Sequence, residues 1–447
     1  MFKRLVASFA VVAMLASTCL SVPAYAETKL PEQPSPWAGL EVYMSSVEDL
    51  GEITSYVNYT SPVQDAQLDV MESDFESRFN YSSADLAFDN EDGVDLTRGQ
   101  VVKELYAVIQ ASLKGEYKNE EDSALNYFVE NKLMYGNGQD YALDKICTVQ
   151  EMILLSHRVY THVVYGNEDE SKGAFWKIND GDNTVYLLGS IHVSDGKLYP
   201  MQKEIMKGFV NSDALVVECN VASMTAEVQA QIQQIMMLSD GTKLEDHVSA
   251  ETFEQFVALG AKAGLTRDMC NMYKPWAAGN IVSSINMALS GKDSSRGVDM
   301  YLMNLAKVFQ KDIEELETVM LQMNMFDSFS NELQEMNLKS SLANESNDAI
   351  LDNMLQSWHE GDLEKVQTSL NDESANASAT EEEKALAAEF NQKLLTDRNP
   401  GMIEKVKEML AESDKDYFVV AGTLHMVGDD GIVKVLEDAG YTVERIK

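Results

Sequence analysis

The sequence predicts an α-helical N-terminal domain followed by an α/β, or α+β, C-terminal domain. Three observations predict this division. Apolar residues recur at helical spacing up to residue 166 without a convincing strand, short apolar strands begin near residue 175, and a long helical stretch divides those strands into two groups. A chain of 447 residues with 45% apolar residues is long enough for more than one core. We therefore expect domains at 27–166 and 167–447.

The first 26 residues predict export. Lys3 and Arg4 precede an apolar run that ends in the small-residue sequence Ala-Tyr-Ala, which is the pattern of a cleavable signal peptide. We expect cleavage before Glu27. A membrane anchor is the alternative, but the run is short for a span of about 20 residues. No later segment is long and apolar enough to span a membrane, so we expect a secreted or cell-wall-associated protein.

The net charge excludes one class of partner. The formal charge is −38, and removing Lys3 and Arg4 with the signal peptide takes it to −40. A surface this acidic repels phosphate backbones and anionic lipids. We therefore expect no binding to nucleic acid.

Two stretches of the N-terminal domain repeat one helix-start pattern. Thr97 stands three residues before Gln100, and Thr148 three residues before Glu151, each ahead of an apolar-periodic run. Both pairs are typical of a capping box. The region from about residue 35 to 165 resembles S-layer homology modules, which implies docking to a cell-wall polymer. Gln100 and Val149 depart from the Thr-Arg-x-Glu pattern of those modules, and two of the usual three repeats are visible. An all-helical accessory domain is the alternative.

Strand character begins after the acidic stretch that ends near residue 170. Residues 175–178 and 185–188 flank a turn rich in Asn, Asp and Gly, which predicts a β-hairpin. Residues 214–217 form a third apolar strand. The stretch from 222 to 409 is almost wholly helical, and its Ser/Asn/Ala-rich segment at 371–380 is predicted to be a loop.

The end of the chain returns to alternating elements. A strand at 417–421, a helix at 431–438 and a strand at 441–445 form a predicted βαβ unit. The C-terminal domain should therefore contain a partly parallel central sheet with a large helical insertion.

Two of the six histidines share a motif that the other four lack. His192 and His425 each follow a glycine by three residues, Gly189 and Gly422, and both directly follow a buried-type strand. Ligands bind beyond the carboxyl ends of parallel strands in open α/β sheets. Glu218 ends a third strand, where an unpartnered charge would be costly. We expect these side chains to meet at one edge of the sheet.

Two imidazoles and one carboxylate form a ligand set known from catalytic metal sites, where one position stays open for water. A bound metal lowers the pKa of that water and polarises a carbonyl group. Each residue alone has a plainer explanation, since a histidine after a strand is often a core residue and Glu218 could pair with a lysine. The coincidence of all three at strand ends favours a metal site.

The same residues carry a family resemblance. In order along the chain, the matching segments are YLLGSIHV, LVVECN, KPW, RGVD, LET, DRNPGM and VVAGTLHMVGDDGIVKVLEDAGYTVERI. These segments resemble the TraB/GumN family, which is similar to the Tiki metalloproteases and shares their two Gly-x-x-His motifs and a glutamate. The resemblance covers about residues 173–447. It implies an α/β fold and a metal-dependent hydrolase that acts on a peptide or protein substrate, with Mn²⁺, Co²⁺ or Zn²⁺ as the ion.

Carried over by position, the resemblance implies that His192 and His425 are metal ligands and that Glu218 is either a ligand or the general base. Arg398 could clamp a substrate carboxylate or stabilise an oxyanion. The supporting or substrate-contacting candidates are Gly189, Gly422, Asp299, Glu317 and Asn399.

Several of these candidates also have a structural explanation. Asn399 before Pro400 is typical of a helix N-cap with proline at the first helical position. Asp299 and Glu317 lie on helix-like stretches where a charge is commonly solvated.

The leading hypothesis is thus an exported metal-dependent hydrolase. One alternative is a non-catalytic protein on the same fold that binds a metal, haem or a signalling peptide. The other alternative is a wall-attached interaction protein.

Overall fold

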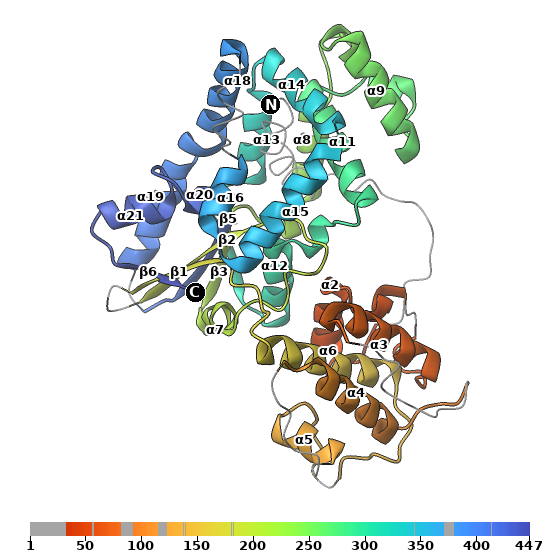
Figure 1. The fold of residues 1–447 in the computed structure, drawn as a ribbon. Coiled ribbons are helices and arrows are strands. Elements are labelled where there is room, and N and C mark those ends of the chain that lie inside the picture. Colours follow the sequence, from red (N-terminus) through yellow and green to blue (C-terminus); the bar gives the residue numbers. More distant parts are fainter. Residues whose placement is uncertain are drawn as a thin grey trace. The chain divides into compact units, whose positions relative to one another are not determined.

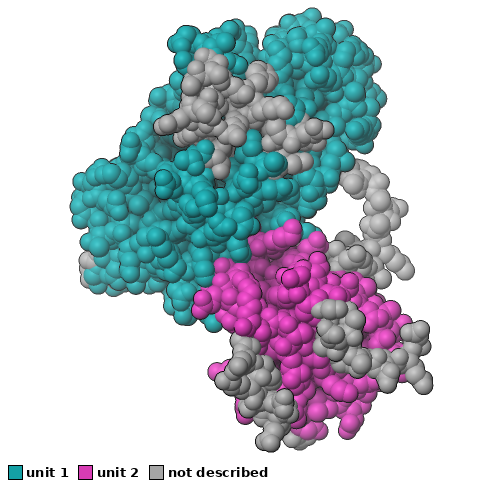
Figure 2. All heavy atoms as spheres, viewed as in Figure 1, with its two compact units in different colours: residues 1–23, 171–195, 201–447 teal, residues 24–170, 196–200 magenta. Residues whose placement is uncertain are grey.

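The computed structural model describes residues 33–55, 58–81, 93–114, 123–136, 138, 140–179, 181, 183–343, 345–370, 380–412 and 414–447. The predicted signal peptide at 1–26 and nearly all of the predicted loop at 371–380 lie outside these residues. The described chain divides into two compact units (Figure 2), one of Ser171–Asp195 and Met201–Lys447, the other of the residues up to Glu170 with Gly196–Pro200. Within the described part, no helix combines the length and apolar character of a membrane span.

A six-stranded sheet forms the centre of the C-terminal unit (Figure 1). Its strands are β1 (Ala174–Asn179), β2 (Thr184–Ser190), β3 (Ala214–Val217), β4 (Asp312–Glu315), β5 (Tyr417–Gly422) and β6 (Val443–Ile446). The order is β4-β3-β5-β2-β1-β6, in which β4, β3, β5 and β2 are mutually parallel and β1 is antiparallel to both of its neighbours. This arrangement confirms the predicted α/β class, the β-hairpin and the partly parallel sheet.

The central strands are buried on both faces. Every residue of β3 and of β5 is buried, as expected for apolar strands covered by helices on both sides. Helix α7 (Lys203–Asn211) covers one face, where Phe209 packs edge-on against Phe418 with ring centroids 5.8 Å apart. Figure 1 shows α19 (Asn399–Ala411) and α21 (Ile432–Asp438) on the other side of the sheet from α7. Helices packed on both faces therefore hold the residues at the strand ends in fixed positions.

The predicted helical insertion lies between β3 and β5. Besides α19, its described α-helices are α8 (Ala226–Met236), α9 (Ala250–Gly260), α10 (Arg267–Cys270), α11 (Pro275–Leu289), α12 (Val298–Val308), α13 (Val319–Asp327), α14 (Asn331–Leu342), α15 (Glu345–Glu360), α16 (Leu363–Leu370) and α18 (Glu381–Asn391).

One strand within this insertion was missed by the sequence prediction. Strand β4 pairs in parallel with β3 at the edge of the sheet. Its sequence, Asp-Ile-Glu-Glu, carries three acidic residues, which an edge strand tolerates because it is only partly covered. The apolar signal that marks a buried strand is therefore absent.

The N-terminal unit is helical, as predicted. Its elements are α2 (Gly39–Val47), the 3₁₀ turn Leu50–Ser55, α3 (Asp65–Phe79), α4 (Arg98–Ser112), α5 (Ala124–Glu130) and α6 (Val149–Gly166). Three extended residues connect its parts in a ring of backbone hydrogen bonds. The Val63 N–H donates to the Cys147 carbonyl, the Cys147 N–H to the Leu96 carbonyl, and the Leu96 N–H to the Val63 carbonyl, at 2.8–2.9 Å.

Each member of this ring is followed by a helix that begins with a capping box. The predicted boxes at Thr97 and Thr148 are present, and a third joins Gln64 to Gln67 at the start of α3. The sequence analysis found two repeats because the third has glutamine, an unusual N-cap, where the others have threonine. The structure thus shows three equivalent helix starts around one centre.

Candidate metal centre

The register of the parallel strands brings the site residues to one edge of the sheet. Ser190 at the end of β2 is paired with Gly422 at the end of β5, and Val217 at the end of β3 is paired with both Val420 and Glu315. Side chains that follow these strand ends therefore emerge close together. His192, Glu218, Glu317 and His425 all come from this edge, and all are buried.

Asp299 of α12 fixes the ring of His192. The His192 Nδ1 lies 2.7 Å from Asp299 Oδ2, and the other carboxylate oxygen accepts a hydrogen bond of 2.8 Å from the Ser190 hydroxyl. Burial by itself would lower the pKa of His192, but the carboxylates of Asp299 and Glu218 together outweigh it and raise that pKa. With Nδ1 engaged, the Nε2 atom is the one available for a ligand.

Asn399 fixes the second histidine in the same way. The His425 Nδ1 lies 2.6 Å from Asn399 Oδ1, and because an amide oxygen only accepts, Nδ1 carries the proton. Burial lowers the pKa of His425 to about 3, so its imidazole is neutral at pH 7. The predicted N-cap role of Asn399 is wrong, since Arg398 occupies that position and Asn399 is the first residue of α19.

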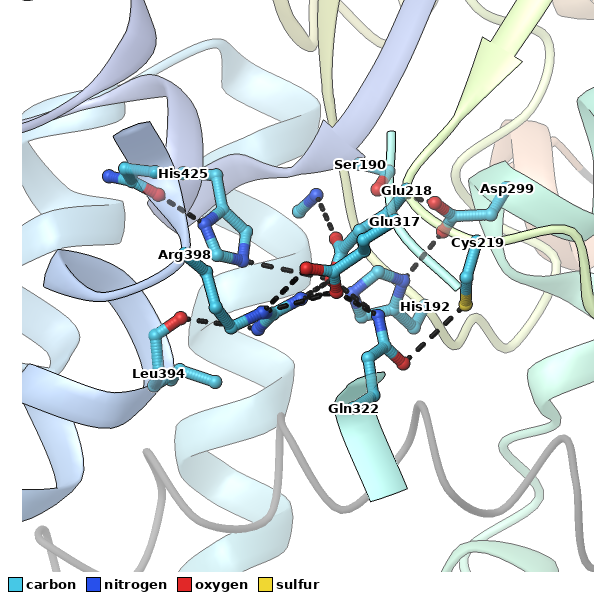
Figure 3. A network of polar contacts seen from close by, with 12 residues as sticks. Ser190, His192, Glu218, Cys219, Asp299, Glu317, Gln322, Leu394, Arg398 and His425 are labelled. Carbon is cyan, nitrogen blue, oxygen red and sulfur yellow. Dashed lines mark hydrogen bonds and ion pairs between the residues drawn. The ribbon is translucent and has the colours of Figure 1, made fainter. Parts of the chain in front are cut away.

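Glu218 lies between the two histidines (Figure 3). Its Oε1 is 3.7 Å from His425 Nε2, and its Oε2 accepts a hydrogen bond of 3.0 Å from the Gly422 N–H. Burial opposes ionisation of Glu218, yet its pKa falls to about 2 because His425 and Arg398 favour the anion. Since His425 is neutral at pH 7, the guanidinium of Arg398 is the permanent charge that keeps this carboxylate ionised.

Arg398 joins Glu218 to a second buried carboxylate. Its Nη2 forms ion pairs with both Glu218 and Glu317, its Nε donates to Glu317, and its Nη1 donates to the Leu394 carbonyl at 3.1 Å. Burial, the largest effect, raises the pKa of Glu317 despite the neighbouring guanidinium. The structure corrects the predicted helical position of Glu317, which lies between β4 and the N-cap residue Thr318 of α13.

Gln322 is a site residue that the sequence analysis missed. Its Nε2 donates to Glu218 Oε1 at 3.0 Å and to Glu317 Oε1 at 2.8 Å, and its Oε1 accepts from the Cys219 thiol at 3.5 Å. One amide nitrogen thus bridges two carboxylates that would otherwise repel each other. No motif distinguishes this glutamine from the other polar residues of α13.

The two motif glycines serve different purposes. A Cβ atom at Gly422 would lie 3.2 Å from His192 Nε2 and 3.5 Å from Glu218 Oε2, directly beside the potential ligand atoms. A Cβ atom at Gly189 would instead lie 2.9 Å from Ala174 Cβ and 2.9 Å from Thr423 Cα. Gly422 therefore keeps space open at the site, whereas Gly189 allows the strands and the following turn to pack closely.

The side chains gathered at the strand ends are of the types that bind divalent cations. Three carboxylates, those of Asp299, Glu218 and Glu317, accompany one guanidinium and the imidazole of His192, so acidic groups outnumber the cationic ones. The 3.7 Å between His425 Nε2 and Glu218 Oε1 allows both atoms to reach one ion at about 2 Å each. Among the described residues, however, no group of three or more His, Cys, Asp or Glu side chains is arranged so that it could hold a metal ion. Arg398 and Gln322 instead occupy Glu218 Oε1.

A small cavity connects the two histidines. It has a volume of about 30 Å³, enough for about one water molecule, and both His192 and His425 line it. Met354 of α15 and Val366 of α16 contribute apolar walls. The Trp358 indole of α15 donates a 2.7 Å hydrogen bond to the Gly189 carbonyl, which holds α15 against the first Gly-x-x-His segment. The helical insertion thus covers the strand-end site.

The sequence pattern that defines the TraB/PrgY/gumN family matches residues 174–445. The chain belongs to this family. The matched region includes β1 to β5, most of β6 and every residue of the strand-end site, so family membership and geometry concern the same part of the molecule. The match confirms the resemblance predicted for the C-terminal domain, whereas the S-layer homology of the N-terminal unit stays a prediction.

Two curated proteins are similar to parts of this chain. Uncharacterized protein YbaP of Escherichia coli is 23% identical over 260 residues, which cover 57% of this chain and 89% of YbaP. A protein of Nematostella vectensis described as a metalloprotease TIKI homolog is 31% identical over 105 residues, 22% of each chain. No solved structure matches the chain.

Proposed function

We propose that the C-terminal unit is a divalent-metal-dependent hydrolase that cleaves peptide bonds outside the cytoplasm. The observation that carries this proposal is the convergence of both Gly-x-x-His histidines on Glu218, with each Nδ1 held by a separate polar partner. Similarity to a protein described as a metalloprotease supports the reaction class. The predicted signal peptide supports the location.

His192, His425 and Glu218 would hold the ion, with Mn²⁺, Co²⁺ or Zn²⁺ as candidates. When bound, the ion would lower the pKa of a water molecule and polarise the substrate carbonyl. Asp299 and Asn399 orient the two imidazoles, as supporting partners of metal-bound histidines do. The apolar side chains of Met354 and Val366 reduce the access of bulk water to the small cavity.

We assign Glu218 as a ligand rather than as the general base. Its carboxylate already accepts hydrogen bonds from Gly422, Gln322 and Arg398, and its low pKa makes it a poor proton acceptor near neutral pH. Arg398 is a positioning residue in this assignment. All three of its guanidinium nitrogens already contact groups within the protein, which favours this positioning role over a substrate clamp.

Metal titration by calorimetry tests this function. The full-length protein should bind one Mn²⁺ or Co²⁺ ion per site, and His192→Ala and His425→Ala should each weaken binding by more than about 100-fold, beyond the effect of losing a supporting residue. His247→Ala is the matched control, because this histidine contacts Thr242 away from the site.

Peptide cleavage separates an enzyme from a binding protein on the same fold. The metal-loaded protein should cleave members of a mixed peptide library, and His192→Ala should lose this activity. Metal or peptide capture without cleavage would instead support a non-catalytic binding protein. Absence of divalent-metal binding to the wild-type chain would refute the proposed function.

We also propose that the N-terminal unit attaches the protein to a cell-wall polymer. A cavity of about 620 Å³ lies within this unit, and the exposed rings of Trp37 and Tyr135 line it beside Arg98 and Arg158. The Arg158 guanidinium lies 5.1 Å from the centre of the Tyr135 ring. Both guanidinium groups are paired with carboxylates, Arg98 with Glu151 and Arg158 with Glu41. The exposed aromatic rings are therefore the main support for binding a polymer of sugar rings.

Sedimentation of the full-length protein with isolated cell walls tests this attachment. Wild-type protein should sediment with the walls, and combined Trp37→Ala and Tyr135→Ala substitutions should abolish most of that binding. Val70→Ala, an exposed apolar change on α3, is the control. Wild-type protein that stays in the supernatant would contradict the proposal.

A further inference from the structure

A larger cavity lies directly beside the small cavity that contains the histidines. It has a volume of about 260 Å³, and Leu395 and Leu424 line both cavities. Asn399, which holds His425, forms part of its wall. A molecule bound in the larger cavity would therefore lie next to the proposed metal centre.

The charged groups of this cavity all have one sign. Among the described residues that line it, Asp429 and Asp430 are the only charged side chains, and both are exposed. Gln367, Asn391 and Asn399 supply amide groups. Lys434 of α21 lies within electrostatic range of Asp429, but its ammonium group is paired with Asp438 and does not line the cavity.

The segment that carries the two aspartates is tied to the metal centre. The Asn399 Nδ2 donates a 2.8 Å hydrogen bond to the Asp430 carbonyl, while Oδ1 of the same side chain binds His425. Gly428 has φ +91°, which favours glycine, and a Cβ atom at Gly431 would lie 2.5 Å from the Val427 carbonyl oxygen. The buried amide of Asn399 thus holds the acidic wall of the cavity, Asp429 and Asp430, in position relative to His425, a proposed metal ligand.

We propose that this cavity is a substrate subsite for a positively charged group beside the scissile bond. The inference rests on the proposed hydrolase function, which it deepens by naming the substrate class. The volume is below the roughly 300–1,000 Å³ of pockets that enclose whole drug-sized ligands, so it suits one residue of a longer peptide. The carboxylates attract a cation and repel an acidic residue. Either a lysine or arginine side chain or an N-terminal ammonium group has the required chemistry.

Equilibrium binding measures this preference without relying on catalysis. Fluorescent peptides that differ only in one central residue, Lys, Ala or Glu, would be titrated into the full-length His192→Ala variant at low ionic strength. A second set with acetylated N-termini distinguishes a side-chain cation from a terminal one. The lysine peptide should bind about two- to fivefold more tightly than the alanine peptide, as expected for ion pairs with exposed carboxylates.

The acidic wall should account for that difference. Combined Asp429→Asn and Asp430→Asn substitutions should remove the advantage of the cationic peptide while binding of the alanine peptide stays unchanged. Glu437→Gln, an exposed change on α21, is the control for loss of a carboxylate outside the cavity. High salt should weaken the cationic preference because it screens exposed charges.

The outcomes separate this inference from the proposed function. Charge selectivity that disappears in the double variant supports the subsite even if wild-type protein binds no metal and cleaves nothing. The contrary outcome is a wild-type protein that binds metal and cleaves peptides but shows no cationic preference, either in peptide binding or at the cleaved bonds. That result would overturn the subsite and leave the proposed hydrolase function intact. Binding that weakens equally for all three peptides on acetylation assigns the subsite to the N-terminal ammonium group. A lysine preference that persists after acetylation assigns the subsite to a side chain.

Discussion

Replacing Arg398 with methionine should lower the free energy of unfolding of the metal-free C-terminal unit by about 3–5 kcal/mol, the usual cost of removing one partner from a buried ion pair. The guanidinium is the only cation in ion-pair contact with Glu218 and Glu317 among the described residues, apart from a histidine that is neutral at pH 7. Without Arg398, two carboxylates would remain buried at adjacent strand ends. Urea unfolding followed by tryptophan fluorescence measures the loss.

A divalent cation should reverse part of this loss. The Arg398→Met site has one more uncompensated negative charge than the wild-type site, so Mn²⁺ should raise the unfolding midpoint of the variant more than that of the wild-type protein. Arg398→Lys is the matched control, because lysine keeps the charge but lacks the planar fork that contacts two carboxylates. Equal stability of the methionine variant and wild type, with and without metal, would contradict this role for Arg398.

Burial explains which strands the sequence could predict. Strands β2, β3 and β5 are recognisable because apolar residues fill central positions that helices cover on both faces. Strand β4 depends on pairing with β3 rather than on its own apolar content, so its acidic sequence gives no strand signal. The position of Glu317 could not be predicted for the same reason, because it follows directly from β4.

The candidate site was predictable only where its residues stand next to strands. His192, His425 and Glu218 have local markers, namely a preceding buried strand and, for the histidines, a glycine three residues earlier. Gln322 and Trp358 reach the site from helices that the packing of the insertion brings to it. Their contacts depend on tertiary structure across more than 100 residues of sequence, and a polar or aromatic residue within a helix carries no local mark of them.

The role of each motif glycine can be separated by the same small substitution. Gly422→Ala should weaken metal binding by about 100-fold, at the upper end of the effects seen for residues that support metal ligands. Its Cβ atom would lie beside both His192 Nε2 and Glu218 Oε2. The backbone of Gly422, with φ −49° and ψ 138°, suits any L-residue, so the cost in stability should stay below about 1 kcal/mol.

Gly189→Ala should reduce stability more, and metal affinity less, than Gly422→Ala does. Its Cβ atom would approach Ala174 Cβ and the Thr423 backbone to 2.9 Å, closer than normal contact, so the added methyl group should cost about 1–3 kcal/mol of stability. This strain lies between strands rather than between metal ligands, so calorimetry should show a smaller change in metal affinity than for Gly422→Ala. Two variants with equal affinities and equal melting temperatures would show that Gly422 does not keep space open for an ion. Weaker metal binding by Gly422→Ala than by Gly189→Ala would instead show that the ion needs the space beside His192 and Glu218. Neither variant changes a proposed ligand.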